Sequence, residues 1–242
     1  MDGIRELAAA IDRAHRERRL LDAAAQPPLD LPAAYAVQRE LTALRTTRGA
    51  HRIGVKLGYT SRAMRDQMGI NEPNHGPLLD TMRITDGRVP ETLVQPRIEP
   101  EIALVLGPDL RPVAAHAALE VVDSVWQDYR FSLELNTADG SSATGVALGP
   151  PLSLDTLAEL PVRLLRNGAT VAEGTGAAAM GDPLRALDWL RQALSSKPDT
   201  LRPGDIVITG GLTAAIPVEP GDVVEAVFGD HAASVRLHRP HR

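Results

Sequence analysis

Apolar residues follow two different periods along the chain, a helical one first and a strand-like one afterwards. Within residues 1–50 they recur at helical spacing in two segments, one starting at Ile4 and one following Asp30. Pro32 falls where the first turn of a helix tolerates proline, and Gly49 can end the second helix. The pattern predicts an N-terminal helical hairpin packed on the rest of the chain.

Residues 51–242 are predicted to form a β-rich body. Short apolar runs there are separated by Gly, Pro and Asn, which is the composition that bounds strands. We find no internal repeat and no linker long enough to separate independent domains, so the sequence predicts an α+β fold that forms a single structural unit. The segments predicted as strands are 52–58, 101–106, 144–148, 162–173, 205–209 and 222–237.

Three local signals sharpen this outline. Asn167 and Gly168 lie between two apolar runs and form the dipeptide that favours a two-residue hairpin turn with positive φ. Asp182 precedes a proline and a helical pattern of leucines, so we expect it to begin a helix. A second, short helix is expected from Ser61 to Gly69.

Charge, apolar run length and the absence of cysteine limit the partners and the kinds of metal site that the chain can have. The net charge is −5 with a pI near 5.8, and no Lys/Arg block is present, which excludes a nucleic-acid partner. No apolar stretch approaches the roughly 18 residues that span a bilayer, and the N-terminus lacks the pattern of an export signal, so we expect a cytoplasmic protein with no membrane partner. The absence of cysteine means that any metal is held by oxygen or nitrogen ligands, which points to Mg²⁺ or Mn²⁺.

Two glutamates lie at the start of the most apolar run of the body. Glu99 and Glu101 directly precede Ile102, and in a strand they would project to the same face, roughly 6.5 to 7 Å apart. Like charges beside buried sequence are costly unless a cation lies between them, and a divalent metal with oxygen ligands is the usual solution. An edge strand with a solvated acidic face has the same pattern, so the pair alone leaves both interpretations open.

Glu120 is a third acidic residue within an apolar stretch, where an unpaired carboxylate would be expensive. With Glu99 and Glu101 it would supply three carboxylates to an octahedral ion. The alternative is one polar position on an amphipathic helix. Asp123, three residues further on, is expected either to support the site from behind its ligands or to cap a secondary-structure element.

Lys56 is one of only two lysines among the 26 basic Lys and Arg residues. Gly54 and Gly58 flank it, and we expect them to leave its backbone accessible, so that the ammonium can hold a substrate carboxylate or polarise an oxygen. A solvated lysine at a strand edge is the alternative. The small polar loop 139–145 can bind an oxyanion through its hydroxyl and N–H groups, or can be an ordinary turn.

Taken in order, five motifs resemble the 2-keto-4-pentenoate hydratase/4-oxalocrotonate decarboxylase family of the fumarylacetoacetate hydrolase superfamily. The resemblance covers essentially the whole chain. The motifs are Gly-Val-Lys-Leu-Gly-Tyr-Thr-Ser at 54–61, Gly-Pro-Leu-Leu-Asp at 76–80, Pro-Arg-Ile-Glu-Pro-Glu-Ile at 96–102, Ala-Leu-Glu-Val-Val-Asp-Ser at 118–124 and Pro-Gly-Asp-Ile-Val-Ile-Thr-Gly at 203–210.

The resemblance implies a mixed β-roll or β-sandwich body of the fumarylacetoacetate hydrolase C-terminal type, with Mg²⁺ or Mn²⁺ on Glu99, Glu101 and Glu120. It implies a divalent-metal-dependent lyase on a small-molecule 2-oxo acid or its enol. The reaction is either hydration of a 2-hydroxy-2,4-dienoate or decarboxylation of an oxalocrotonate-type diacid. Catalytic roles fall on Lys56, Asn74 and Ser142, and substrate-binding roles on Lys56, His75, Leu79, Ser141 and Ser142.

Three departures from the family pattern qualify these expectations. Asn74 and His75 stand where Asp-Phe is expected, and an amide cannot act as a general base. Ala143 replaces a second serine of the polar loop, and the stretch between Glu101 and Glu120 is shorter than expected by most of a helix. Loss of a general base should impair decarboxylation less than hydration, because decarboxylation depends more on the metal as an electron sink.

Two alternatives therefore remain open beside the lyase. One is a catalytically altered homologue with a structural or biosynthetic role, and the other is an acylpyruvate C–C hydrolase. The resemblance also implies a homo-oligomer, with association to a related hydratase or decarboxylase subunit as a further option.

Overall fold

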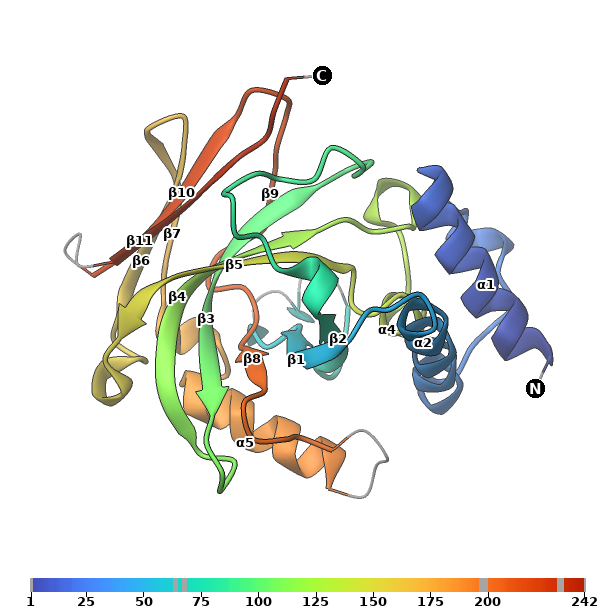
Figure 1. Cartoon of the computed structure of the whole chain (residues 1–242), viewed down its shortest axis with the longest axis horizontal. Coiled ribbons are helices and arrows are strands. Elements are labelled where there is room, and N and C mark those ends of the chain that lie inside the picture. The colour runs from blue at the N-terminus through green and yellow to red at the C-terminus, as the bar shows by residue number, and fades with distance from the viewer. Residues whose placement is uncertain (1, 63–64, 67–68, 196–199, 230–232, 242) are drawn as a thin grey trace.

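The computed structural model combines two β-sheets with a layer of helices at one side (Figure 1). The fumarylacetoacetate hydrolase C-terminal type of body and the α+β class predicted from the sequence are confirmed. No helix among the described residues is long and apolar enough to cross a membrane. The structure describes residues 2–62, 65–66, 69–195, 200–229 and 233–241.

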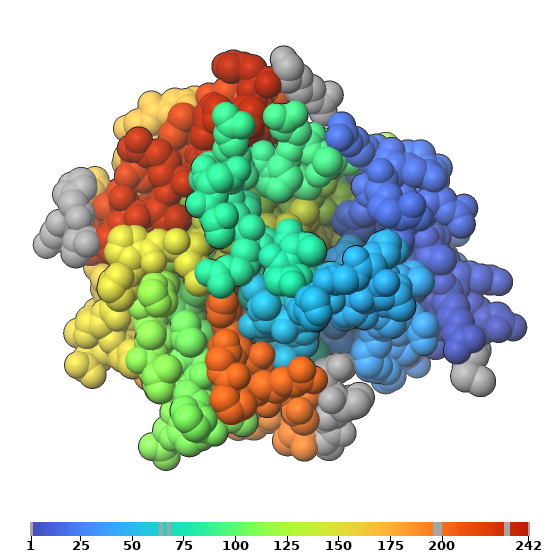
Figure 2. All heavy atoms as spheres, viewed as in Figure 1, coloured from blue at the N-terminus to red at the C-terminus, as the bar shows by residue number. Residues whose placement is uncertain are grey.

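The N-terminal helical hairpin is present as predicted. It consists of α1 (Asp2–Glu17) and α2 (Leu31–Thr46). The Asp30 side chain caps α2 by accepting a hydrogen bond from Ala33 N at 2.8 Å. The buried faces of both helices pack with the short helix α4 (Leu133–Ala138), and Figure 2 shows the hairpin in direct contact with the body.

Trp126 lies at the centre of this helical layer and is fully buried. Its indole N–H donates to Leu135 O on α4 at 3.0 Å, so the ring joins α4 to the hairpin through both packing and a hydrogen bond.

The larger sheet carries the candidate site. Its strands are ordered β2-β1-β8-β3-β4-β5, with β9 added beside β3, and it is mixed because β1 and β8 run parallel. Gly54 is required at that parallel pair, since a Cβ there would lie 1.9 Å from Ile206 O. The strands are β1 (Arg52–Gly58), β2 (Asn74–Leu79), β3 (Arg97–Leu106), β4 (Pro112–Val122), β5 (Ala143–Leu152), β8 (Ile206–Ile208) and β9 (Ile216–Pro217).

The smaller sheet packs on the larger one and encloses the main apolar core together with α5 (Pro183–Leu194). Asn167 and Gly168 adopt φ of 52° and 84° between β6 and β7, which confirms the predicted hairpin turn. Asp182 caps α5 through Leu184 N at 2.8 Å, as expected. The strands are β6 (Pro161–Arg166), β7 (Ala169–Thr175), β10 (Val223–Phe228) and β11 (Ala233–His238), in the order β11-β10-β6-β7.

All six predicted strand segments contain strands, but β2, β4 and the two-residue β9 lie outside the predicted segments. The sequence of β4 is rich in alanine, which has a low strand propensity, and tertiary packing overrides that preference. The predicted helix from Ser61 to Gly69 includes residues 63–64 and 67–68, which lie outside the described residues. Short 3-10 turns connect several elements, at Ala23–Ala25, Asp80–Met82, Gln127–Tyr129, Leu154–Thr156 and Gly176–Ala178.

Trp126→Ala should lower the free energy of unfolding by about 3 to 5 kcal/mol, because it leaves a cavity between the hairpin and α4 and removes the hydrogen bond from the indole to Leu135 O. Urea denaturation followed by circular dichroism measures the change. Val113→Ala, at a position 62% exposed on β4, is the control and should change stability by less than about 0.5 kcal/mol. Equal stability of the two variants would contradict this account of the helical layer.

Candidate active site

The hairpin of β3 and β4 brings three glutamates to one place. In its register Glu99 is paired with Glu120, and Glu101 lies two residues further along the same face of β3. The two strands are joined by a tight turn in which Gly107 N donates to Arg111 O at 2.7 Å. This turn occupies the place of the longer connection expected from the family, and the shortening leaves the pairing of the glutamates intact.

The three carboxylates form a cluster that fits a metal ion. Each offers an oxygen within 4.8 Å of the others, and Glu101 and Glu120 are fully buried. One oxygen of Glu101 accepts from Gly210 N at 2.8 Å, whereas its other oxygen, and Oε1 of Glu120, have no hydrogen-bond partner. Buried carboxylate oxygens without partners are costly, and a divalent cation would satisfy them.

Electrostatics supports the same conclusion. Burial, reinforced by the charge of Glu120, raises the pKa of Glu99 to about 7 against the opposing effect of Lys56. Burial, followed by the charges of Glu120 and Glu99, also raises the pKa of Glu101 well above its usual value. The raised pKa values mean that negative charge on these carboxyl groups is unfavourable in the absence of a cation. Positive charge from a bound divalent ion would therefore be strongly favourable there.

Two glycines after β8 make room for the cluster. A Cβ on Gly211 would lie 2.2 Å from Oε2 of Glu99, and a Cβ on Gly210, whose φ is +95°, would lie 2.1 Å from Oγ1 of Thr60. Gly210 also supplies the N–H that orients Glu101. The segment thus positions both glutamates of β3 through its backbone.

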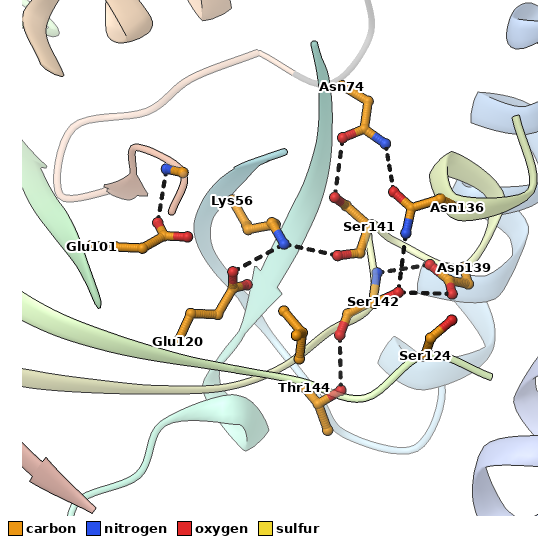
Figure 3. A network of polar contacts seen from close by, with 12 residues as sticks. Lys56, Asn74, Glu101, Glu120, Ser124, Asn136, Asp139, Ser141, Ser142 and Thr144 are labelled. Atoms are coloured by element: carbon orange, nitrogen blue, oxygen red, sulfur yellow. Dashed lines mark hydrogen bonds and ion pairs between the residues drawn. The ribbon is translucent and has the colours of Figure 1, made fainter. Parts of the chain in front are cut away.

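Lys56 on β1 is buried beside the cluster and is not solvated at an edge. Its ammonium lies 2.9 Å from Oε2 of Glu120 and donates to Ser141 O at 2.8 Å. Burial alone would lower the pKa of Lys56, but the charges of Glu120, Glu99 and Glu101 outweigh burial and raise it. Lys56 is therefore a charged bridge between the cluster and the polar loop (Figure 3).

The polar loop holds an uncommon backbone conformation. Gly140, Ser141 and Ser142 have consecutive φ of 88°, 60° and 56°, and two of these three residues carry side chains. Asp139 stabilises the loop, because its Oδ1 accepts from Ser142 N at 2.7 Å. Gly76 allows β2 to pass the loop, since a Cβ there would lie 2.2 Å from Gly140 O.

A chain of hydrogen bonds connects Asn74 to this loop (Figure 3). The Asn74 amide oxygen accepts from Ser141 Oγ at 3.0 Å, and its NH₂ group donates to Asn136 Oδ1 at 3.0 Å and to Thr137 Oγ1 at 2.9 Å. Asn136 in turn donates to Ser142 Oγ at 3.0 Å. Gly58 creates the space, because its Cβ would collide with the Asn74 and Ser141 side chains. Asn74 is fully buried and contacts the loop directly through Ser141 and indirectly through Asn136.

A cavity of 390 Å³ opens onto these groups. Glu99, Lys56 and the two serines are among its lining residues. Arg97 and Tyr129 also line it, with the guanidinium carbon 4.0 Å from the ring centroid, which is a cation–π arrangement. Further lining comes from Leu57, Gly58, Tyr59, Thr60, Ser61, Val122, Asp128, Phe131, Asn136, Gly211, Thr213, Ala214 and Ala215.

Two predicted substrate-binding residues do not line this cavity. His75 points to the opposite face of β2 from Asn74, where it stacks on Tyr35 with ring centroids 4.5 Å apart and lines a separate cavity of 270 Å³. Leu79 is fully buried in an apolar cluster with Met82. Side chains alternate across a strand, so neighbouring residues of β2 cannot share one face.

The structure also shows the roles of Gly54 and Asp123 in more detail than the sequence does. Gly54 serves the close approach of β8 described above, and does not open access to Lys56. The side chain of Asp123 holds the segment that precedes β3, because its two oxygens accept from Val94 N at 2.9 Å and Gln95 N at 2.7 Å, while its backbone N–H donates to Ser142 O of the polar loop at 3.0 Å.

Comparison with known proteins agrees with this geometry. The family model described as fumarylacetoacetate (FAA) hydrolase C-terminal matches residues 79–235. The chain belongs to this family. Its curated relatives include a 4-oxalocrotonate decarboxylase of Pseudomonas sp. (strain CF600), 34% identical over 81% of this chain and 81% of the relative. They also include a 2-keto-4-pentenoate hydratase of Burkholderia vietnamiensis (strain G4 / LMG 22486), 36% identical over 87% of this chain and 86% of the relative.

A solved structure has nearly the same fold as this chain. The 4-oxalocrotonate decarboxylase from Pseudomonas putida G7, complexed with magnesium and adipate, has a TM-score of 0.92 at 30% identity and covers 98% of this chain and 97% of its own. The same enzyme is also known complexed with calcium and acetate, with a TM-score of 0.88. Both complexes contain a divalent cation, which is the class of ion that the glutamate cluster fits.

Gly211→Ala should weaken binding of Mg²⁺ by about 10- to 100-fold, because the added methyl group displaces the Glu99 carboxylate. Isothermal titration calorimetry measures the affinity. Gly3→Ala, at a position with no atom within 4 Å of the new Cβ, is the matched control and should bind as the wild type does. If Gly211→Ala bound Mg²⁺ with unchanged affinity, Glu99 would not be a ligand of the ion.

Burial raises the pKa of Asp139 from its usual range to about 7, despite its hydrogen bonds from Ser142. Between about pH 4 and 7 the folded protein therefore keeps a proton that the unfolded chain loses, and this carboxyl lowers stability as pH rises, by about 1.4 kcal/mol per pH unit. Asp139→Asn should show a shallower decline across that window in urea titrations with EDTA present. Identical slopes for the two proteins would contradict the raised pKa.

Proposed function

We propose that this protein is a divalent-metal-dependent lyase acting on a small 2-oxo acid or its enol, by hydration or by decarboxylation. The observation that carries the proposal is the cluster of Glu99, Glu101 and Glu120, of which Glu99 lines a cavity large enough for such an acid. The hydratases and decarboxylases among its relatives support the reaction class.

The three glutamates would hold the ion, and their purely oxygen donor set favours Mg²⁺ or Mn²⁺. A divalent cation bound there stabilises negative charge on the C2 oxygen of a 2-oxo acid, which is the electron sink that both reactions need. Lys56 keeps Glu120 in place and fixes the Ser141 carbonyl, so the distance between the cluster and the polar loop is set by one side chain.

Substrate positioning would fall on the polar loop and on Arg97, which also lines the cavity. Ser141 and Ser142 border the cavity, and Arg97 faces it without an ion pair to any described carboxylate. The guanidinium group can accept a carboxylate of an acidic substrate while it stays stacked on Tyr129. Asn74, whose amide is fully engaged in hydrogen bonds, orients the loop and does not transfer protons.

Glu99→Gln and Glu101→Gln should each lower metal-dependent turnover by at least about 100-fold, because each removes a charged ligand. Turnover is measured by ultraviolet absorbance on a panel of 2-hydroxydienoates and 2-oxo diacids with Mg²⁺ or Mn²⁺, and mass spectrometry identifies the products. Glu173→Gln, an exposed glutamate on β7, is the control and should retain full activity.

The panel also decides among the reactions. A water adduct identifies a hydratase, a product lighter by CO₂ identifies a decarboxylase, and cleavage of an acylpyruvate identifies the hydrolase. Full activity of the Glu99→Gln and Glu101→Gln variants, or no turnover and no metal binding by the wild type, would contradict the proposal. The second outcome favours a structural role.

A further inference from the structure

A buried carboxylate lies behind Ser142, outside the set of residues that line the cavity. Asp139 is 1% exposed and binds Ser142 twice, accepting from its N–H at 2.7 Å and from its hydroxyl at 3.2 Å. In the view of Figure 3 it lies on the far side of Ser142 from Lys56 and the glutamates. Ser142 is thus placed between the cavity and the carboxylate.

The hydrogen bonds around Ser142 fix the direction of its hydroxyl group. Asn136 donates to Ser142 Oγ, and Ser142 Oγ donates to Asp139 Oδ2. A hydroxyl oxygen carries two lone pairs, so one remains for a group in the cavity that Ser142 lines. With Asp139 ionised, Ser142 can accept a proton from that group only by passing its own to Asp139.

We propose that Asp139 exchanges protons with the substrate through the Ser142 hydroxyl group, and so performs the transfer that Asn74 cannot perform. This inference rests on the proposed function. Ser142 is the catalytic residue that touches the substrate, and Asp139 is a positioning residue that acts through it.

The step is balanced without any further reactant. When a proton leaves C3 of a 2-oxo acid, the C–H bond breaks and the proton passes to Ser142 Oγ, while the Ser142 hydroxyl proton passes to Asp139 Oδ2. The electron pair of the C–H bond forms the C2–C3 double bond, and the C2 oxygen becomes negative. The reverse sequence delivers a proton to carbon and leaves Asp139 ionised.

The surroundings of Asp139 suit this exchange. Its pKa of about 7 lies near neutral pH, where a group that both gives and takes protons is most effective. The charged and titratable groups that interact with it are Lys56 from β1, Arg45 from α2, and the phenols of Tyr59 and Tyr129. Burial, the largest effect, raises its pKa, while the hydrogen bonds from Ser142 and the charges of Lys56 and Arg45 favour the ionised form.

The test measures proton transfer alone, as exchange of the C3 protons of 2-oxopentanoate into D₂O, followed by ¹H NMR with Mg²⁺ or Mn²⁺ present. Asp139→Asn and Ser142→Ala should each slow exchange by about 100-fold or more, and the double variant should be no slower than the slower single one. Asn at position 139 retains an acceptor for Ser142 N, so the loop keeps its conformation.

Asp123→Asn is the matched control, since it changes another buried aspartate that accepts two backbone N–H groups but lies outside the cavity lining. Its exchange rate should stay within about threefold of the wild type. The relay would be overturned if Asp139→Asn exchanged within about threefold of the wild-type rate. It would also be overturned if the rate reductions of the two single variants multiplied in the double variant. Neither result would contradict the proposed lyase function. A wild type that exchanges nothing with either ion would overturn both.

A second measurement is independent of turnover. In metal-free protein labelled with ¹³C at aspartate carboxyl groups, one signal should titrate near neutral pH in the wild type and in Asp123→Asn, and should be missing from Asp139→Asn. If Asp139→Asn shows the same aspartate signals titrating near neutral pH as the wild type, the relay is wrong.

Discussion

The convergence of three carboxylates at one point of the β3–β4 hairpin is the constraint on which the site depends. The pairing of Glu99 with Glu120 fixes two of them, and the period of a strand fixes Glu101. Repulsion between these groups has to be offset inside the protein, and each neighbouring element contributes: β1 provides an ammonium group, the segment after β8 provides a backbone N–H, and the cavity leaves room for an ion.

Small residues make this arrangement possible. Gly58, Gly76 and Gly211 stand where a methyl group would strike a functional side chain or the polar loop. Their role is steric, because none of the three has a positive φ. For Gly58 on β1 and Gly76 on β2 the cost is a loss of local stability in the strand, and the cross-strand pairs of the large sheet compensate for it.

Much of the site could be predicted because its signals are local. The spacing of Glu99 and Glu101, and an acidic Glu120 in apolar sequence, are visible in the chain, as is the turn at Asn167. The link from Asn74 to Asn136 could not be read from the sequence, because the two residues are 62 positions apart, whereas the links from Asn136 to Ser142 and from Ser142 to Asp139 are local. The placement of His75 was predictable in principle: if Asn74 faces the loop, the next residue of the same strand has to face away.

Lys56 has a consequence for how the enzyme acquires its ion. One of the three negative charges already has a counter-ion supplied by the chain itself, and the raised pKa values of the other two carboxyls let protons neutralise them. The chain therefore offsets part of this charge without metal, in contrast to small zinc domains in which binding and folding are one event. On this basis we expect the metal-free protein to fold first and to take up its divalent ion afterwards, to an extent set by the free concentration of that ion.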